Sequence, residues 1–189
     1  MKKTIVTALA VLTLFSCKNE TEKTAENSKT EIAKFSPEVE ESAVIYEVNI
    51  RQYSPEGTFN AFTKDIPQLK ELGVKIIWVM PIFPISQTKR KATGGDDSKF
   101  ASEMPKEEQH KYLGSYYAVS DFKKVNPEFG TIEDFRNLVK TAHDNGIYVI
   151  LDWVPNHTGW DHIWTKTNPE FYKKTTSGDF KTAEGMADI

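Results

Sequence analysis

Short apolar runs alternate along this chain with segments whose apolar residues recur at helical spacing. The runs cover residues 44–50, 74–81 and 147–153. Strands that alternate with helices are typical of βαβ units, in which neighbouring strands of one sheet run parallel. The pattern therefore predicts an α/β fold built on a parallel sheet.

Two helices are expected between the three strands. The first covers residues 60–72, where Pro67 should cause a kink or a restart and Asp65 can act as a cap. The second begins at Thr131, in a Thr-Ile-Glu-Asp sequence that resembles a capping box, and Gly146 marks its end. The apolar stripe of this second helix consists of Ile132, Phe135, Leu138, Val139 and Ala142.

The polar segment at residues 86–111 is too long for an ordinary connection between a strand and a helix. It contains a Gly-Gly-Asp-Asp sequence, which favours a loop over a buried element. We therefore expect a surface insertion over one face of the fold.

Residues 1–16 resemble a secretory signal peptide. Two lysines precede an apolar run that is too short to span a bilayer as a helix. The run ends in Leu-Phe-Ser-Cys, which resembles a bacterial lipobox and implies cleavage before Cys17 and lipidation of that cysteine. A plain secretory signal with an incidental cysteine is the alternative.

Residues 17–42 are mostly Lys, Glu, Thr, Asn and Ser, a composition that predicts a flexible tether. Several acyl chains on Cys17 would give stable anchoring, whereas a single chain anchors only marginally. The amino-terminal sequence thus predicts an exported bacterial lipoprotein, anchored at an outer membrane or cell surface.

The composition of the whole chain is that of a soluble globular protein, with 39% hydrophobic and 27% charged residues. A net charge of −3 without a basic stripe gives no reason to expect a nucleic-acid partner. The single cysteine excludes an intrachain disulfide framework.

The third apolar run leads directly into three polar residues, Asp152, Asn156 and His157. In folds with parallel strands, ligands bind at the carboxyl ends of the strands, so polar residues in this place are candidate site residues. The alternative is structural: Asp152 and Asn156 would cap a loop, and His157 would pack as a hydrogen-bonded histidine.

Three stretches together resemble glycoside hydrolase family 13, the α-amylase family. Residues 150–157, Ile-Leu-Asp-Trp-Val-Pro-Asn-His, resemble the Asp-x-x-x-Asn-His pattern at the end of that family's third barrel strand. Residues 116–131 resemble the segment before its second barrel helix, and residues 72–81 resemble its second strand. The resemblance covers residues 43–158 and implies the first three strands of a (β/α)8 TIM barrel, with residues 159–189 as the beginning of domain B.

The resemblance also implies roles for individual side chains. Tyr117 matches the tyrosine that stacks on the sugar at the cleavage subsite, where an aromatic face suits the apolar side of a pyranose. His157 matches the histidine that hydrogen-bonds a hydroxyl of that sugar. Asp152 matches an aspartate that orients neighbouring groups, and Arg51 and Asp121 are expected to be structural members of the same polar network.

Calcium is the one cofactor that the resemblance implies, and no organic cofactor is expected. Asn156 matches the family's calcium-ligand asparagine, and Asp188 lies where some members supply a further aspartate ligand. Calcium takes about six to eight oxygen ligands, of which these two residues would supply a part.

The implied activity is retaining hydrolysis of α-1,4-glucans such as starch, glycogen or maltodextrins. This reaction needs two carboxyl groups about 5–5.5 Å apart, which the family places on its fourth and fifth strands. A full barrel takes roughly 250 residues, so we expect an amino-terminal fragment with an incomplete barrel, inactive alone, whose nucleophile and acid/base lie beyond Ile189. The alternatives are a glycan-binding lipoprotein that lacks the catalytic carboxylates, and a transglycosylase or isomerase of the same family.

Overall fold

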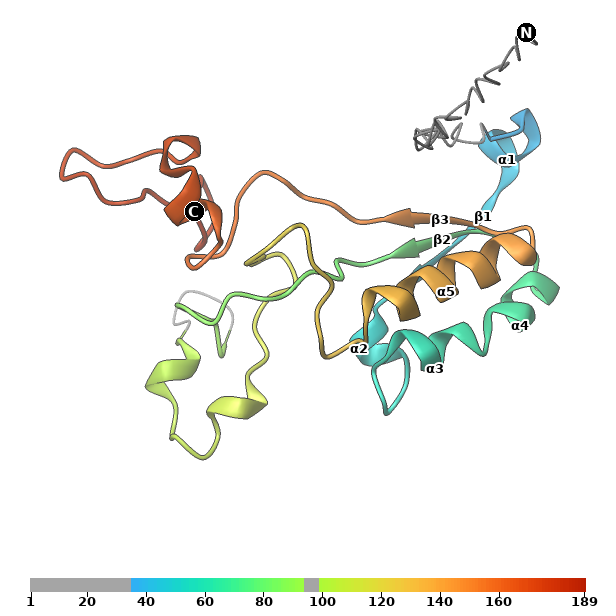
Figure 1. The fold of residues 1–189 in the computed structure, drawn as a ribbon, viewed down its shortest axis with the longest axis horizontal. Coiled ribbons are helices and arrows are strands. Elements are labelled where there is room, and N and C mark those ends of the chain that lie inside the picture. Colours follow the sequence, from blue (N-terminus) through green and yellow to red (C-terminus); the bar gives the residue numbers. More distant parts are fainter. Residues whose placement is uncertain (1–34, 94–98) are drawn as a thin grey trace, which may run out of the picture. The chain divides into compact units, whose positions relative to one another are not determined.

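The computed structural model describes residues 35–93 and 99–189. The predicted signal peptide, the lipidation site at Cys17 and most of the predicted tether lie outside these residues. The helices are α1 (Pro37–Ser42), α2 (Ile50–Tyr53), α3 (Phe59–Thr63), α4 (Ile66–Glu71), α5 (Ile132–Asp144) and α6 (Trp164–Thr167), with short 3₁₀ helices at Ala101–Glu103, Gln109–Lys111 and Pro169–Phe171. The strands are β1 (Val44–Val48), β2 (Val74–Val79) and β3 (Tyr148–Leu151) (Figure 1). No helix in the described ranges is long and apolar enough to cross a bilayer.

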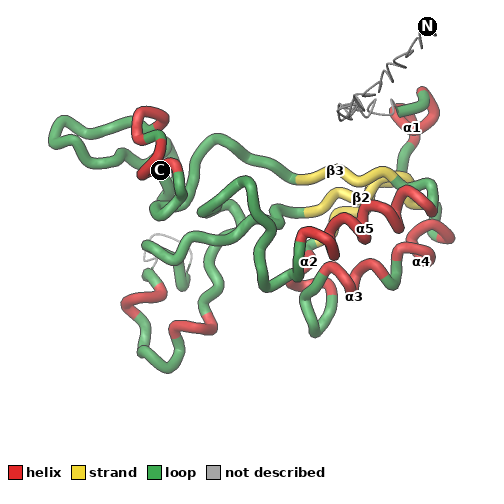
Figure 2. Tube along the Cα trace, viewed as in Figure 1, coloured by secondary structure: helices red, strands yellow, loops and turns green. Residues whose placement is uncertain are grey.

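The three strands form one parallel sheet in the order β1-β2-β3 (Figure 2). Val48 of β1 lies opposite Val79 of β2, and Val79 lies opposite Leu151 of β3. Because β1 and β3 each pair on one side only, the described strands form an open sheet and not a closed barrel. The prediction of an α/β fold with the first strands of an incomplete barrel is confirmed.

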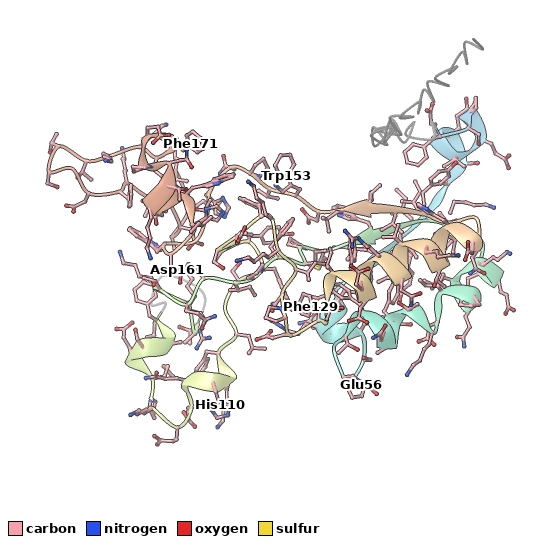
Figure 3. All side chains as sticks on the ribbon, viewed as in Figure 1. Glu56, His110, Phe129, Trp153, Asp161 and Phe171 are labelled. Carbon is pink, nitrogen blue, oxygen red and sulfur yellow. The ribbon has the colours of Figure 1, made fainter. Side chains whose placement is uncertain are left out.

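One face of the sheet packs against α3, α4 and α5 (Figure 1). The buried side chains of this core include Val48, Ile77 and Val79 from the strands and Phe59, Phe62, Ile66, Leu138 and Ala142 from the helices. Phe129 completes the core beside α2 and α3, with its ring edge-on to that of Phe59 at 5.8 Å between centroids (Figure 3). Successive side chains of a strand point to opposite faces of the sheet, so every second side chain points into this core.

The opposite face of the sheet carries a row of uncovered side chains. Glu47, Trp78 and Ile150 are neighbours across the three strands, and Trp78 and Ile150 are 38% and 37% exposed. In a closed barrel this face would line the interior, where side chains fill the space.

The predicted interruption of the first helix at Pro67 is present. The segment forms two helices, α3 and α4, with Pro67 in the first turn of α4, where its missing N–H costs no hydrogen bond. Asp65 occupies the cap position, but its carboxylate does not cap the helix and instead accepts the Tyr53 hydroxyl at 2.8 Å. That bond ties the helix break to α2.

The predicted capping box opens α5. Thr131 Oγ1 accepts the N–H of Asp134 at 3.2 Å, and Oδ2 of Asp134 accepts the N–H of Thr131 at 2.7 Å. The pKa of Asp134 is lowered most by the Thr131 hydroxyl, which donates to Oδ2 at 2.7 Å, and the N–H of Thr131 and the Asn60 amide add to the effect. Aspartate therefore replaces the usual Glu or Gln of the motif without loss of the reciprocal bond.

Replacing Thr131 by alanine is expected to lower the free energy of unfolding by about 1 kcal/mol, because an N–H at the helix start loses its acceptor. The Thr131→Ser variant keeps the hydroxyl and should retain most of the stability. Urea unfolding followed by circular dichroism measures both variants. Equal unfolding free energies for the wild type and Thr131→Ala would contradict this assignment.

Several element boundaries differ from the sequence expectation. β1 ends at Val48 because the chain turns into α2 at Ile50, and β3 stops before Asp152. Ile132 was expected in the buried stripe of α5, but it lies at the first turn and is 46% exposed.

Helix α1 lies inside residues 17–42, the range predicted as a flexible tether. Ser36 caps the helix by accepting the N–H of Val39, and Pro37 is its first residue. The ring of Phe35 also packs edge-on against Tyr148, with 4.7 Å between centroids. The end of the predicted tether is therefore ordered by a helix cap, a proline at the helix start and an aromatic contact. The polar composition of the segment did not predict this order.

Candidate functional site

Tyr117 and Asp152 come together at the carboxyl end of the sheet. Asp152 directly follows β3, and its N–H donates to the carbonyl oxygen of Val79 at 2.8 Å. The hydroxyl of Tyr117 donates to Oδ2 of Asp152 at 2.9 Å. Burial raises the pKa of Tyr117, as do this hydrogen bond and the charges of Asp152 and Glu47. The tyrosine therefore stays neutral and holds the Asp152 carboxylate in one orientation.

His157 lies in the loop after β3 and is 7% exposed. The side-chain nitrogen of the exposed Asn156 is 3.4 Å from Nδ1 of His157. An amide nitrogen donates, so Nδ1 accepts in the tautomer that leaves this nitrogen without a proton. The backbones of Thr158 and Ile189 exchange two hydrogen bonds, at 2.6 and 3.0 Å, which bring the last residues of the chain beside this loop.

Arg51 has its own partners. Its Nη2 donates to Oε2 of Glu128 at 2.9 Å, and its guanidinium carbon lies 4.7 Å from the ring centroid of Tyr116. It therefore braces the segment next to Tyr117 and makes no ion pair with Asp121.

Asp121 belongs to a separate set of contacts. Burial alone would raise the pKa of Asp121, but the N–H of Lys123 at 2.8 Å and the ammonium of Lys124 at 3.3 Å lower it below its ordinary value. The single polar network expected for Arg51 and Asp121 is thus two networks, because Glu128 and Lys124 satisfy these charges separately.

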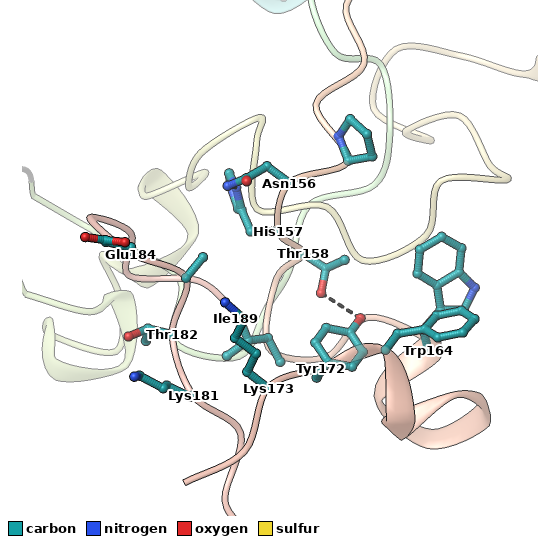
Figure 4. A pocket seen from close by; sticks show the side chains of 13 residues that line it. Asn156, His157, Thr158, Trp164, Tyr172, Lys173, Lys181, Thr182, Glu184 and Ile189 are labelled. Carbon is teal, nitrogen blue, oxygen red and sulfur yellow. Dashed lines mark hydrogen bonds between the residues drawn. The ribbon is translucent and has the colours of Figure 1, made fainter.

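A cavity of about 520 Å³ opens beside His157 (Figure 4). Its wall combines the aromatic side chains of Trp164 and Tyr172 with the charged groups of Lys181 and Glu184. No motif in the sequence marks these residues. Their one sequence signal is a local concentration of Trp, Phe and Tyr after His157.

His162 is a buried polar residue that the sequence motifs did not single out. Its ring packs against those of Phe122 and Trp164, at 5.3 and 4.6 Å between centroids. Nδ1 accepts the N–H of Trp164 at 3.1 Å, so Nε2 carries the proton, and it has no partner among the described residues. Burial lowers the pKa of His162, and the charges of Asp121 and Asp161 oppose this shift.

The stability of the folded chain is expected to fall as the pH drops below about 6.5, the ordinary histidine value. Because the pKa of His162 is lower in the folded chain than in the unfolded chain, the unfolded chain binds more protons and acid favours unfolding. The contribution is complete above the unfolded value and is lost as the pH falls through the folded value. A His162→Phe variant should show a shallower slope of unfolding free energy against pH, and the exposed His110→Gln variant should match the wild type. Equal slopes for His162→Phe and the wild type would count against this assignment.

Asn156 and Asp188 both lie near His157. Asn156 contacts the ring, and the charge of His157 acts on Asp188. Burial raises the pKa of Asp188, and the positive charges of His157 and Lys91 partly offset it. A partly buried carboxylate is a group that a bound cation would stabilise. Within residues 35–93 and 99–189, no group of three or more His, Cys, Asp or Glu side chains is placed to hold a metal ion, so these two supply only part of a calcium coordination sphere.

Residues 18–185 match the model of the Alpha-amylase family, described as "Alpha amylase, catalytic domain". Alpha-amylase 3 of Dictyoglomus thermophilum is 30% identical over 136 residues, which cover 69% of this chain and 22% of that protein. Alpha-amylase SusG of Bacteroides thetaiotaomicron is 37% identical over 108 residues, which cover 57% of this chain and 12% of that protein. A solved alpha-amylase from Lactobacillus plantarum superposes with a TM-score of 0.62 at 36% identity, over 74% of this chain and 29% of that chain. The chain therefore spans less than a third of each of these proteins.

Proposed function

We propose that this chain, which belongs to the family of alpha-amylase catalytic domains, supplies the first strands and a sugar-binding edge of a retaining α-1,4-glucan hydrolase. The observation that carries the proposal is the hydrogen bond from Tyr117 to Asp152, at the end of the sheet where parallel α/β folds bind ligands. Starch, glycogen and maltodextrins are the proposed substrates.

The pair of Tyr117 and Asp152 suits sugar binding. With its hydroxyl held by Asp152, the tyrosine ring has a fixed plane on which the apolar side of a pyranose can stack. His157 adds an imidazole whose ring nitrogens can hydrogen-bond a sugar hydroxyl. Tyr117 and His157 together would give one apolar and one polar contact to the same sugar ring.

Three carboxylates of these segments already have other roles. Asp152 accepts from Tyr117, Asp121 is held by Lys123 and Lys124, and Asp161 accepts two backbone N–H groups. In the proposal, the nucleophile and the acid/base come from other residues of the catalytic domain.

Incubation of the full-length protein with maltoheptaose tests the proposal. Proton NMR of the first products should show the α-anomer before mutarotation, because two displacements at the anomeric carbon retain its configuration. Initial formation of the β-anomer would exclude the retaining mechanism. Absence of cleavage in a correctly folded protein would exclude the hydrolase.

We further propose that calcium binds at Asn156 and Asp188, with further ligands from elsewhere in the catalytic domain. When bound, the ion would act structurally, by holding the loop that carries His157 against the last residues of the chain. Calcium-sensitive thermal unfolding tests this point: EDTA should lower the unfolding midpoint of the wild type but not of Asp188→Ala.

We also propose that Cys17 is lipidated and anchors the protein to a membrane, which would keep the enzyme at the surface where polysaccharide is available. Labelling of growing cells with a palmitate analogue should mark the wild type and leave Cys17→Ser unlabelled. Labelling of both proteins would exclude Cys17 as the site.

A further inference from the structure

The first residues of the insertion contact the segment that carries Tyr117. We call residues 86–89 the insertion turn. The N–H of Ser86 donates to the carbonyl oxygen of Ala118 at 2.7 Å, and Ser86 is 1% exposed. The insertion turn is therefore bonded directly to the neighbour of Tyr117.

The insertion turn also contacts the loop that carries His157. Oδ2 of Asp161 accepts the N–H groups of Gln87 at 2.8 Å and of Thr88 at 3.0 Å. Hydrogen bonds between a carboxylate and backbone N–H groups are stronger than those between neutral groups. Figure 3 labels Asp161 where the loop after β3 meets the insertion.

Lys89 and Trp160 form a second link between the same two segments. Nζ of Lys89 lies 3.2 Å from the ring centroid of Trp160. Lys89 has a φ of 52°, in the left-handed region that non-glycine residues seldom adopt. The contact holds the Lys89 ammonium over the indole of Trp160 as a cation–π pair.

The two segments approach too closely for any side chain at position 159. A Cβ on Gly159 would lie 2.3 Å from Cβ of Ser86. The N–H of Gly159 also donates to the carbonyl oxygen of Val119 at 2.8 Å. The insertion turn, the segment after Tyr117 and the loop after His157 therefore form one continuous hydrogen-bonded unit.

We propose that Asp161 and Lys89 are positioning residues, which set the separation of Tyr117 and His157 and thereby determine how the sugar at the cleavage subsite is held. The inference rests on the proposed function of these two side chains as sugar contacts. It gives the insertion at residues 86–111 a role in substrate binding that needs no direct contact between the insertion and the sugar.

The test is a double-mutant cycle that pairs Asp161→Ala with His157→Ala in the full-length protein. Calorimetric titration with a thio-linked maltoheptaose, whose glycosidic bonds resist hydrolysis, gives the Kd of each variant, and initial rates of maltoheptaose cleavage give kcat and KM separately. Asp161→Ala should weaken binding about tenfold in the wild-type background but less than twofold when His157 is already alanine, because residues that act through one another are not additive. Asp161→Asn keeps an acceptor oxygen and should weaken binding less than Asp161→Ala.

Two further variants keep the result interpretable. The exposed Asp144→Ala is the matched control and should leave Kd unchanged. Lys89→Met keeps the length of the side chain but loses its charge, so it should weaken binding several-fold. In the His157→Ala background the same change should have no effect on binding. This variant tests the inference even if Asp161→Ala does not fold.

Equal effects of Asp161→Ala in both backgrounds would overturn the inference, because they would indicate a general structural role. Unchanged Kd values in both Asp161→Ala and Lys89→Met would overturn it as well. If the wild type neither cleaved maltoheptaose nor bound its thio-linked analogue, the proposed function would be overturned, and the inference with it.

Discussion

Replacing Tyr117 by alanine is expected to lower kcat/KM for maltoheptaose cleavage about 100-fold or more. The change removes the proposed stacking ring and leaves the carboxylate of Asp152 without the hydroxyl that donates to it at 2.9 Å. A hydrogen bond to a charged group contributes about 1.5–3 kcal/mol, and each 1.4 kcal/mol corresponds to roughly tenfold. The ring contact adds to this loss.

Matched variants separate the two parts of this effect. Tyr117→Phe keeps the ring and loses only the hydroxyl, so its kcat/KM should fall about tenfold. Tyr116→Phe is the control, because the ring of Tyr116 contacts Arg51 and remains in this variant. If Tyr117→Ala and Tyr116→Phe had kcat/KM values within a factor of about two, the sugar-binding role of Tyr117 would be wrong.

Replacing Phe59 by alanine is expected to lower the free energy of unfolding by about 3–5 kcal/mol. Phe59 is fully buried, and its ring packs against those of Phe129 and Phe135, at 5.8 and 5.3 Å between centroids. Its N–H also donates to the carbonyl oxygen of Phe129 at 2.9 Å, so the neighbouring backbone cannot collapse freely into the cavity. A loss of this size is a large part of the stability of an ordinary domain.

Urea unfolding of the purified protein measures this loss, with Leu72→Ala as the control. Leu72 is 73% exposed, so its truncation should change the free energy of unfolding by less than about 0.5 kcal/mol. A comparable loss in both variants would show that the aromatic cluster around Phe59 is not the centre of the core.

Much of the fold could be predicted from local sequence. The three apolar runs became the strands of a parallel sheet, and the Thr-Ile-Glu-Asp sequence became a capping box at α5. Pro67 separated two helices, as its ring and its missing N–H require. These features succeed because they depend on backbone geometry and on neighbours a few residues away.

Other features depended on residues far apart in the sequence. Asp65 had the position of a cap, but the Tyr53 hydroxyl competes for its carboxylate. The family resemblance placed Arg51 and Asp121 in one polar network, yet Arg51 pairs with Glu128, 77 residues away in the sequence, and Asp121 pairs with Lys124. The partner of Arg51 is set by which opposite charge lies near it in space, and sequence spacing does not specify that.

The sequence by itself determined the parallel α/β architecture, the family resemblance and the choice of Tyr117 and Asp152 as site residues. Only the tertiary structure decided that these two side chains share a hydrogen bond, and that Asp161 joins the insertion turn to the loop of His157. The physical reason is the range of each effect. Hydrophobic periodicity and capping act along the chain, whereas hydrogen bonds between segments require the strands to bring their ends together first.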